Sequence, residues 1–199
     1  MRRQRNLLGP QGMGGMVSLW GASSLIKSVQ AVTVSITGSN TSGTTAINSV
    51  DTASTMLLPA GFTSAGTTGY ATYTLPSVTL TNATTLTATK LAGDATVAPN
   101  AYGINVLEFS SGIIKSIQYV SWTYVGTTSG DTFSINSVNT SKSVLVLLGW
   151  MSNGGTWQGR FVFPRVYFNS ATQLGITAFQ DPYGSGYDSY PRVMVVEFF

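Results

Sequence analysis

Hydrophobic and polar residues alternate with a period of two along most of the chain, the pattern of half-buried β-strands. Val32, Val34 and Ile36 alternate with threonine and serine, and the β-branched residues that dominate such stretches pack well on a pleated surface. Clusters of Gly, Ser, Asn and Thr separate the stretches as turns. No stretch carries the 3.6-residue spacing of an amphipathic helix. The pattern predicts an all-β protein, with further strands at 44–50, 54–58, 70–75, 78–80, 85–89 and 103–109.

The strand pattern occurs twice in the chain. Residues 25–30, Leu-Ile-Lys-Ser-Val-Gln, return as Ile-Ile-Lys-Ser-Ile-Gln at 113–118, and residues 46–52 return at 134–140 with the same offset of 88 residues. The closing Val-Leu-Glu-Phe and Val-Val-Glu-Phe segments differ by 89, which places one inserted residue in the second copy after Leu174. A period of this length corresponds to a domain and not to a solenoid turn.

Each copy holds six or seven short strands separated by turn signals, which is typical of an antiparallel β-sandwich. We therefore expect two tandem antiparallel β-sandwich domains, repeat 1 over residues 25–110 and repeat 2 over residues 111–199. The second copy places Val120, Trp122 and Tyr124 at the inward positions of its first strand. The short linker at residues 110–112 favours a fixed relative orientation of the two domains.

The first 24 residues differ in composition from both copies. They are rich in Gly and Met, contain Pro10 and show neither hydrophobic period. The basic start resembles a signal peptide, but residues 9–12, Gly-Pro-Gln-Gly, end the apolar stretch almost at once. We expect an extended, uncleaved docking arm over residues 1–24, with Arg2, Arg3, Arg5, Leu7, Leu8, Met16 and Trp20 as its candidate docking residues.

The body of the chain is poor in charge. Charged residues make up 9% of the sequence, against about 25% in average soluble proteins. Three of the ten basic residues lie within the first five positions, so the remainder carries seven basic against seven acidic residues. A nucleic-acid-binding face needs clustered Lys and Arg, so no nucleic acid is expected as a partner. No run reaches the roughly 18 apolar residues of a membrane span, so no membrane insertion is expected.

The absence of cysteine and histidine removes most catalytic chemistry. It excludes disulfides, thiolate nucleophiles, Cys/His metal sites and imidazole acid–base catalysis. Glycoside hydrolysis needs only two carboxylates at a suitable separation. Glu108 and Glu197 are the one acidic pair present in both copies. We expect no enzymatic activity, no catalytic or metal-ligating residues and no cofactor.

The repeat itself predicts two ion pairs. Lys27 and Lys115 open the first strand of each copy, and Glu108 and Glu197 close the last strand. If these strands adjoin in the sheet, each lysine lies beside the glutamate of its own copy. The alternative is that all four side chains are solvated, because exposed pairs contribute little to stability.

Aromatic residues are concentrated in the second copy, where a loop rich in Tyr, Gly and Asp spans residues 179–190. Tyrosine offers a large amphipathic contact area at low entropic cost, and aspartate accepts hydrogen bonds from sugar hydroxyls. The loop is therefore a candidate contact site for a host-surface receptor or glycan. The alternative is that these aromatic side chains cover the core or a subunit interface. The candidate residues are Trp157, Tyr183, Tyr187, Asp188 and Tyr190.

Several short motifs resemble modules in the structural proteins of tailed bacteriophages and prophages. They are the Ile-Lys-Ser-Val-Gln opening, the Ile-Asn-Ser-Val-Asp-Thr segment and the Val-x-Glu-Phe finish, and the resemblance covers about 25–199 in both copies. It implies a non-enzymatic virion protein, tail- or fibre-associated, that contacts other virion proteins and forms a symmetric homo-oligomer, with a trimer favoured. A head decoration (cement) protein and a receptor- or glycan-binding module acting through the loops of repeat 2 remain alternatives.

Overall fold

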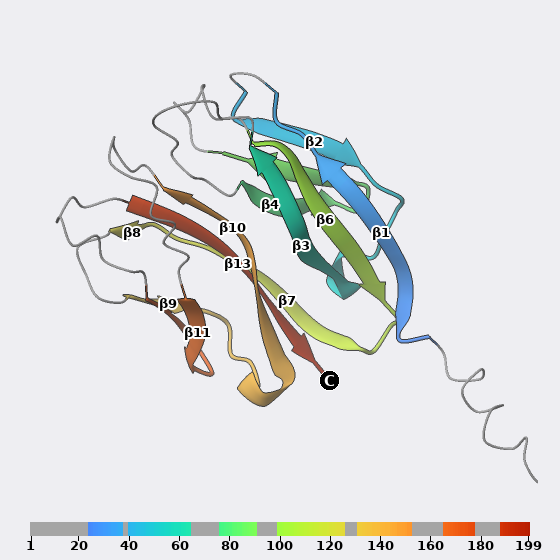
Figure 1. Ribbon diagram of the computed structural model, residues 1–199. Coiled ribbons are helices and arrows are strands. Elements are labelled where there is room, and N and C mark those ends of the chain that lie inside the picture. The colour runs from blue at the N-terminus through green and yellow to red at the C-terminus, as the bar shows by residue number, and fades with distance from the viewer. Residues whose placement is uncertain are drawn as a thin grey trace, which may run out of the picture.

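The computed structural model describes residues 24–37, 40–64, 76–90, 99–125, 131–152, 165–177 and 188–199, which form an all-β structure (Figure 1). The helical segments within these ranges are two single turns of 3-10 helix, η1 (Thr52–Ser54) and η2 (Thr140–Lys142). The all-β prediction is confirmed. The strands are β1 (Ile26–Val34), β2 (Ser42–Ala46), β3 (Thr55–Ser64), β4 (Ser77–Asn82), β5 (Thr85–Thr89), β6 (Pro99–Phe109), β7 (Ile114–Ser121), β8 (Tyr124–Val125), β9 (Asp131–Ser134), β10 (Ser143–Ser152), β11 (Arg165–Ser170), β12 (Gln173–Thr177) and β13 (Asp188–Phe198).

These strands form four antiparallel sheets. Sheet I has the order β1-β6-β3 and sheet II the order β2-β5-β4. Sheet III has the order β7-β13-β10, with β8 also paired to β13, and sheet IV has the order β9-β12-β11. In sheet I the last strand of the first half, β6, lies between β1 and β3, and in sheet III the last strand of the second half, β13, lies between β7 and β10. Apart from β8, strands β7 and β9 to β13 therefore occupy the positions of β1 to β6, as the sequence offset requires.

One predicted strand ends earlier than expected. The prediction of a strand at 44–50 is correct only as far as Ala46, where β2 ends opposite Thr85, the first residue of its partner β5. Beyond this point Ile47 and Val50 donate backbone hydrogen bonds to the β4–β5 turn at 2.9 Å each. The ladder stops because its partner strand begins there. The strand expected at 70–75 lies outside the described residues.

Two hydrophobic cores are present, and the larger one draws on both halves of the sequence. Its first-half members are Val34, Ile36, Ile47, Val50, Leu57, Val78, Leu86, Ala88, Tyr102, Ile104 and Val106, and its second-half members are Ile114, Leu148, Met194 and Val196. The smaller core consists of Trp122, Val138, Leu174, Ile176, Val193 and Val195. Two sandwiches in series would each have a core of their own. Here the first half shares its core with sheet III.

Sheet III is covered on both faces. Along β13, Val193 and Val195 point into the smaller core toward sheet IV, whereas Met194 and Val196 point into the larger core toward the first half. Strand β10 contacts β3 and β4, the edge strands of sheets I and II, and β7 contacts η1. Sheet III therefore lies between the first half and sheet IV, and its outer face closes the side of the first half along β3 and β4 (Figure 1).

Candidate functional site

A buried glutamate at the end of β6 joins three segments of the first half. Glu108 Oε1 accepts hydrogen bonds from Lys27 Nζ at 2.7 Å and from the backbone N–H of Asp51 at 3.0 Å, and its Oε2 accepts from Ser28 Oγ at 3.0 Å. The carboxylate thus connects the start of β1, the end of β6 and the turn that leads into η1. Asp51 also caps η1 by accepting from the backbone N–H of Ala53 at 3.0 Å. We call this arrangement the glutamate hub.

The second half contains the same hub. Glu197 Oε1 accepts from Lys115 Nζ at 2.8 Å and from the backbone N–H of Asn139 at 2.9 Å, and its Oε2 accepts from Ser116 Oγ at 3.3 Å. Asn139 caps η2 in the place where the first half has an aspartate. A neutral amide oxygen serves the cap as well as a carboxylate does, because both accept the N–H bond. Both ion pairs predicted from the sequence are therefore present.

A second polar contact recurs beside each hub. The side-chain amide of Gln30 donates to Asn48 O at 3.1 Å and accepts from Asn48 N at 2.7 Å. Gln118 makes the same pair of bonds with Asn136, at 3.1 and 2.8 Å. Each glutamine side chain thus replaces the missing ladder partner of a loop residue. Together with the hub, it fixes the loop between β2 and β3 in the first half and the loop between β9 and β10 in the second.

The two glutamates remain ionised at neutral pH. The hydrogen bond from Lys27 is the largest influence that lowers the pKa of Glu108 below 4.5, and burial opposes it. The hydrogen bond from Lys115, followed by that from the Asn139 backbone, likewise lowers the pKa of Glu197. Both carboxylates are buried and accept several structural hydrogen bonds. Their arrangement suits them to hold loops and not to exchange protons with a substrate.

The lowered pKa values predict acid-sensitive stability. A carboxyl whose pKa is lower in the folded than in the unfolded chain contributes stability above its unfolded pKa, and this contribution is lost as the pH falls through the folded pKa. We expect the thermal midpoint to be nearly constant above about pH 5 and to fall at lower pH. The double variant Glu108→Gln and Glu197→Gln, which keeps one acceptor oxygen at each site but cannot titrate, should show a shallower acid decline. If the thermal midpoints of the wild type and the double variant fell equally as the pH was lowered, the two glutamates would not be the source of the acid sensitivity.

The junction between the halves is closely packed. The Tyr102 hydroxyl on β6 donates to Leu148 O on β10 at 3.2 Å, and burial raises the pKa of Tyr102 to about 12. Beside Leu148, the Cα of Gly149 lies so near the start of β4 that an added Cβ would stand 2.4 Å from Ser77 Cα and 2.5 Å from Pro76 O. The equivalent residue of the first half, Gly61, faces open space at a φ of 133°.

Replacing Gly149 with alanine tests this close approach. The new methyl group would overlap Ser77 backbone atoms that cannot rotate away, so β10 and β4 must separate. Overpacking of this kind typically costs about 1–3 kcal/mol, and we expect Gly149→Ala to lower the free energy of unfolding by that amount in urea titrations. Thr33→Ala, on the exposed side of β1, is the control and should change it by less than about 0.5 kcal/mol. Equal stabilities of the two variants would show that the junction is looser than described.

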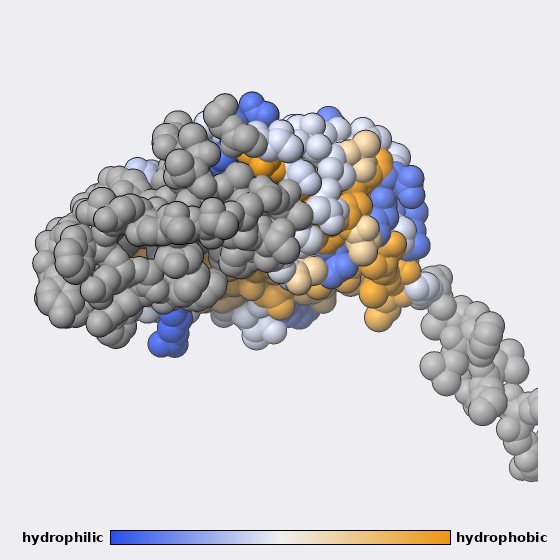
Figure 2. Space-filling model, turned by 45° about the horizontal axis from the view of Figure 1, so that its top comes forward, coloured by the Kyte–Doolittle hydropathy of each residue, from blue (hydrophilic) through white to orange (hydrophobic). Residues whose placement is uncertain are grey.

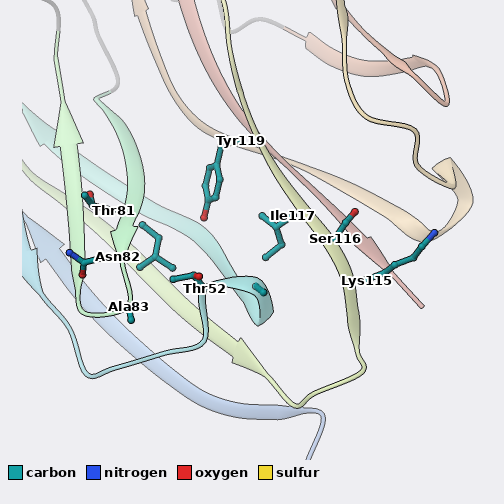
Figure 3. Close-up of a pocket in the computed structure, with 10 residues that line it drawn as sticks. Thr52, Thr81, Asn82, Ala83, Lys115, Ser116, Ile117 and Tyr119 are labelled. Atoms are coloured by element: carbon teal, nitrogen blue, oxygen red, sulfur yellow. The ribbon is translucent and has the colours of Figure 1, made fainter.

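A pocket of about 590 Å³ lies along the same junction. Its first-half wall comes from η1 and the β4–β5 hairpin, and its second-half wall comes from β7. Figure 3 shows Ile117 and Tyr119 projecting from β7 toward Thr52 and Ala83. The pocket marks the place where a strand face of one half meets the hairpin end of the other.

The remaining candidate residues lie mostly outside the described ranges. All seven docking residues of the arm do so, as do Trp157, Tyr183 and Tyr187 of the contact loop. Asp188 opens β13 opposite Val125, and Tyr190 lies two residues further along, opposite Met151, with a half-buried side chain. The structure thus describes only the strand end of the predicted contact loop, and the arm and loop assignments stay predictions.

Within the described ranges, no group of three or more acidic side chains is placed to hold a metal ion. The helical segments of the same ranges include none of the length and hydrophobicity needed to cross a membrane. Comparisons with protein-family models, curated proteins and solved structures give no match to this chain.

The junction residues Leu148, Met194 and Val196 were not predicted from the sequence. Their signal was present, because residues 193–196 read Val-Met-Val-Val without the alternation of a half-buried strand. A continuous apolar run is typical of a strand that is buried on both faces. The equivalent segment of the first copy, residues 104–107, has the polar Asn105 in place of Met194, which interrupts the apolar run.

Proposed function

We propose that the protein is a non-enzymatic structural component of a phage virion, associated with the tail or its fibres. It consists of two antiparallel β-sandwich units in tandem, residues 25–110 and 111–199, which share a core where they meet, behind a docking arm over residues 1–24. The observation that carries the proposal is the repeated unit itself. Both halves have the same sheet order and the same glutamate hub, and a shared core joins them.

This construction suits a rigid building block. The best-connected carboxylates of the described chain hold loops in place, and the two halves meet through core-like packing and not through a flexible linker. A charge-poor, hydroxyl-rich chain favours a protein held in an assembly over one that diffuses freely and relies on net charge for solubility. Its partners are other virion proteins and further copies of itself.

The location of the protein in particles tests the proposal. Particles of the phage that encodes the chain are purified and analysed by quantitative mass spectrometry, and a labelled antibody against the chain is imaged on intact particles by electron microscopy. We expect a fixed copy number per particle and label on the tail or fibres. Label on the head would replace the tail assignment by a decoration role. A protein abundant in infected cells but absent from particles would overturn the proposal.

A further inference from the structure

We propose that the outer face of sheet I of one molecule binds a second copy of this chain, at the side of that copy formed by β10, β11 and η2. This contact between molecules would repeat the contact that joins the two halves within one molecule. This inference rests on the proposed function, which requires assembly, and names the surface and the partner. The internal junction is asymmetric, because a sheet face of one half meets the edge strands and hairpin of the other. Each half therefore carries one surface that the internal junction does not use.

The unused sheet face lies on β1. In the second half, Ile114 and Ile117 of β7 pack against the larger core. Their equivalents in the first half are Ile26 and Val29, which are 39% and 60% exposed. Figure 2 shows hydrophobic surface at the end of the molecule where β1 begins. The first half thus keeps apolar residues at these two positions, although no described part of the same molecule covers them. Exposed apolar side chains that lie together mark an interaction site.

The unused receiving side lies on β10 and the β11–β12 hairpin. The turn between β11 and β12 corresponds to the turn between β4 and β5, which lines the internal junction pocket. Ala83, which lines the junction pocket opposite Ile117, corresponds to the exposed Ala171. The second half therefore presents the edge and hairpin that the first half uses to receive sheet III.

The two unused surfaces cannot meet within one molecule. Sheet I and sheet IV lie on opposite sides of sheet III in the stack (Figure 1). A second copy can bring its sheet I to the free side of β10 and β11. Because the contact joins two different surfaces, it is heterologous, and it propagates until the copies close into a ring or form an open chain. A trimeric ring is one such closed form.

The contact between molecules should be weaker than the internal junction. Two apolar residues of the outer face of sheet III, Met194 and Leu148, are replaced in sheet I by Asn105 and Ala60. Less apolar area leaves water on contact, so the association free energy is smaller. We expect association that increases with protein concentration and is favoured where many copies are held close together.

Complementary variants test this arrangement. Val29→Asp blocks the sheet face and leaves the receiving side intact, and Ala171→Asp, on the exposed turn between β11 and β12, does the reverse. Thr33→Asp is the matched control, because it lies on the same face of the same strand but its equivalent, Ser121, is exposed and outside the junction pocket. The three variants and the wild type are compared by sedimentation over a wide concentration range, after circular dichroism has shown that each is folded.

We expect the wild type and Thr33→Asp to associate, each of the other two variants to remain monomeric, and an equimolar mixture of those two to form dimers and nothing larger. Unchanged association of Val29→Asp or Ala171→Asp would overturn the proposed surface while leaving assembly intact. A monomeric mixture beside an associating wild type would overturn the head-to-tail arrangement. A wild type that stays monomeric at all concentrations would count against both the surface and the assembly role.

Cross-linking provides a second measurement that needs no charged substitution. The chain has no cysteine, so single variants Val29→Cys and Ala171→Cys each carry one thiol. A short bismaleimide should join the two variants to each other in a mixture at least severalfold more efficiently than it joins either variant to itself. Equal yields of like and unlike pairs would contradict the inference.

Discussion

Leu148→Ala should lower the free energy of unfolding by about 2–5 kcal/mol, because it removes a fully buried side chain from the junction. Leu148 belongs to the core shared by both halves, and its carbonyl accepts the hydrogen bond from Tyr102. Loss of this packing should therefore destabilise the whole molecule and not the second half alone. In urea, the unfolding curve should move to lower concentration as one transition.

Two spectroscopic probes distinguish these outcomes. Three of the four tryptophans lie after residue 110, so fluorescence follows mainly the second half, whereas far-ultraviolet circular dichroism follows the strands of both. We expect the two curves to coincide in the wild type and in Leu148→Ala. Val144→Ala, on the same strand but 42% exposed, is the control and should cost less than about 1 kcal/mol. Separate transitions by the two probes would show that the halves are independent units.

Glu108→Ala should cost about 1–3 kcal/mol, because it leaves two part-buried donors without an acceptor. The backbone N–H of Asp51 and the hydroxyl of Ser28 both lose their partner. The loop that leads into η1 would lose its tie to β6. Thermal unfolding followed by calorimetry measures the effect, and hydrogen exchange at Asp51 should speed up before global unfolding does.

The matching lysine variant separates the carboxylate from the ion pair. The Lys27 side chain is 63% exposed, so Lys27→Met should cost less than about 1 kcal/mol. A lysine variant as damaging as Glu108→Ala would mean that the ion pair, and not the neutral donors, stabilises the hub. The same comparison between Lys115→Met and Glu197→Ala in the second half provides an internal repeat, and we expect the same order of effects.

The alternation of apolar and polar residues predicted the strands well, because each sheet of the described chain has a face toward a core. Val34 and Ile36 are buried as their positions predicted, and the repeat placed Lys27 beside Glu108 before any contact was known. The other two partners of Glu108, the Ser28 hydroxyl and the Asp51 backbone N–H, were not predictable in this way. The position of the Asp51 backbone depends on where β2 ends, and that depends on the turn that starts β5.

The junction was harder to predict, because it depends on how two similar units meet. An alternating pattern shows that one face of a strand is buried. It does not show whether another part of the protein covers the opposite face. Met194 and Leu148 gave a usable signal as parts of uninterrupted apolar runs. Gly149 gave none, because its equivalent Gly61 is also glycine, for a different reason: Gly61 has a positive φ, and Gly149 is pressed against Ser77.

The shared core also constrains the order of events during synthesis. The first half leaves the ribosome before Met194 and Val196, which complete its core, have been translated. Until then, the apolar side chains along the edge strands β3 and β4 are exposed to water, because sheet III does not yet cover them. The nascent chain at this stage resembles an aggregation-prone folding intermediate. The shared core can form only when β13 emerges, so a chain shortened before residue 194 should need chaperones and precipitate without them.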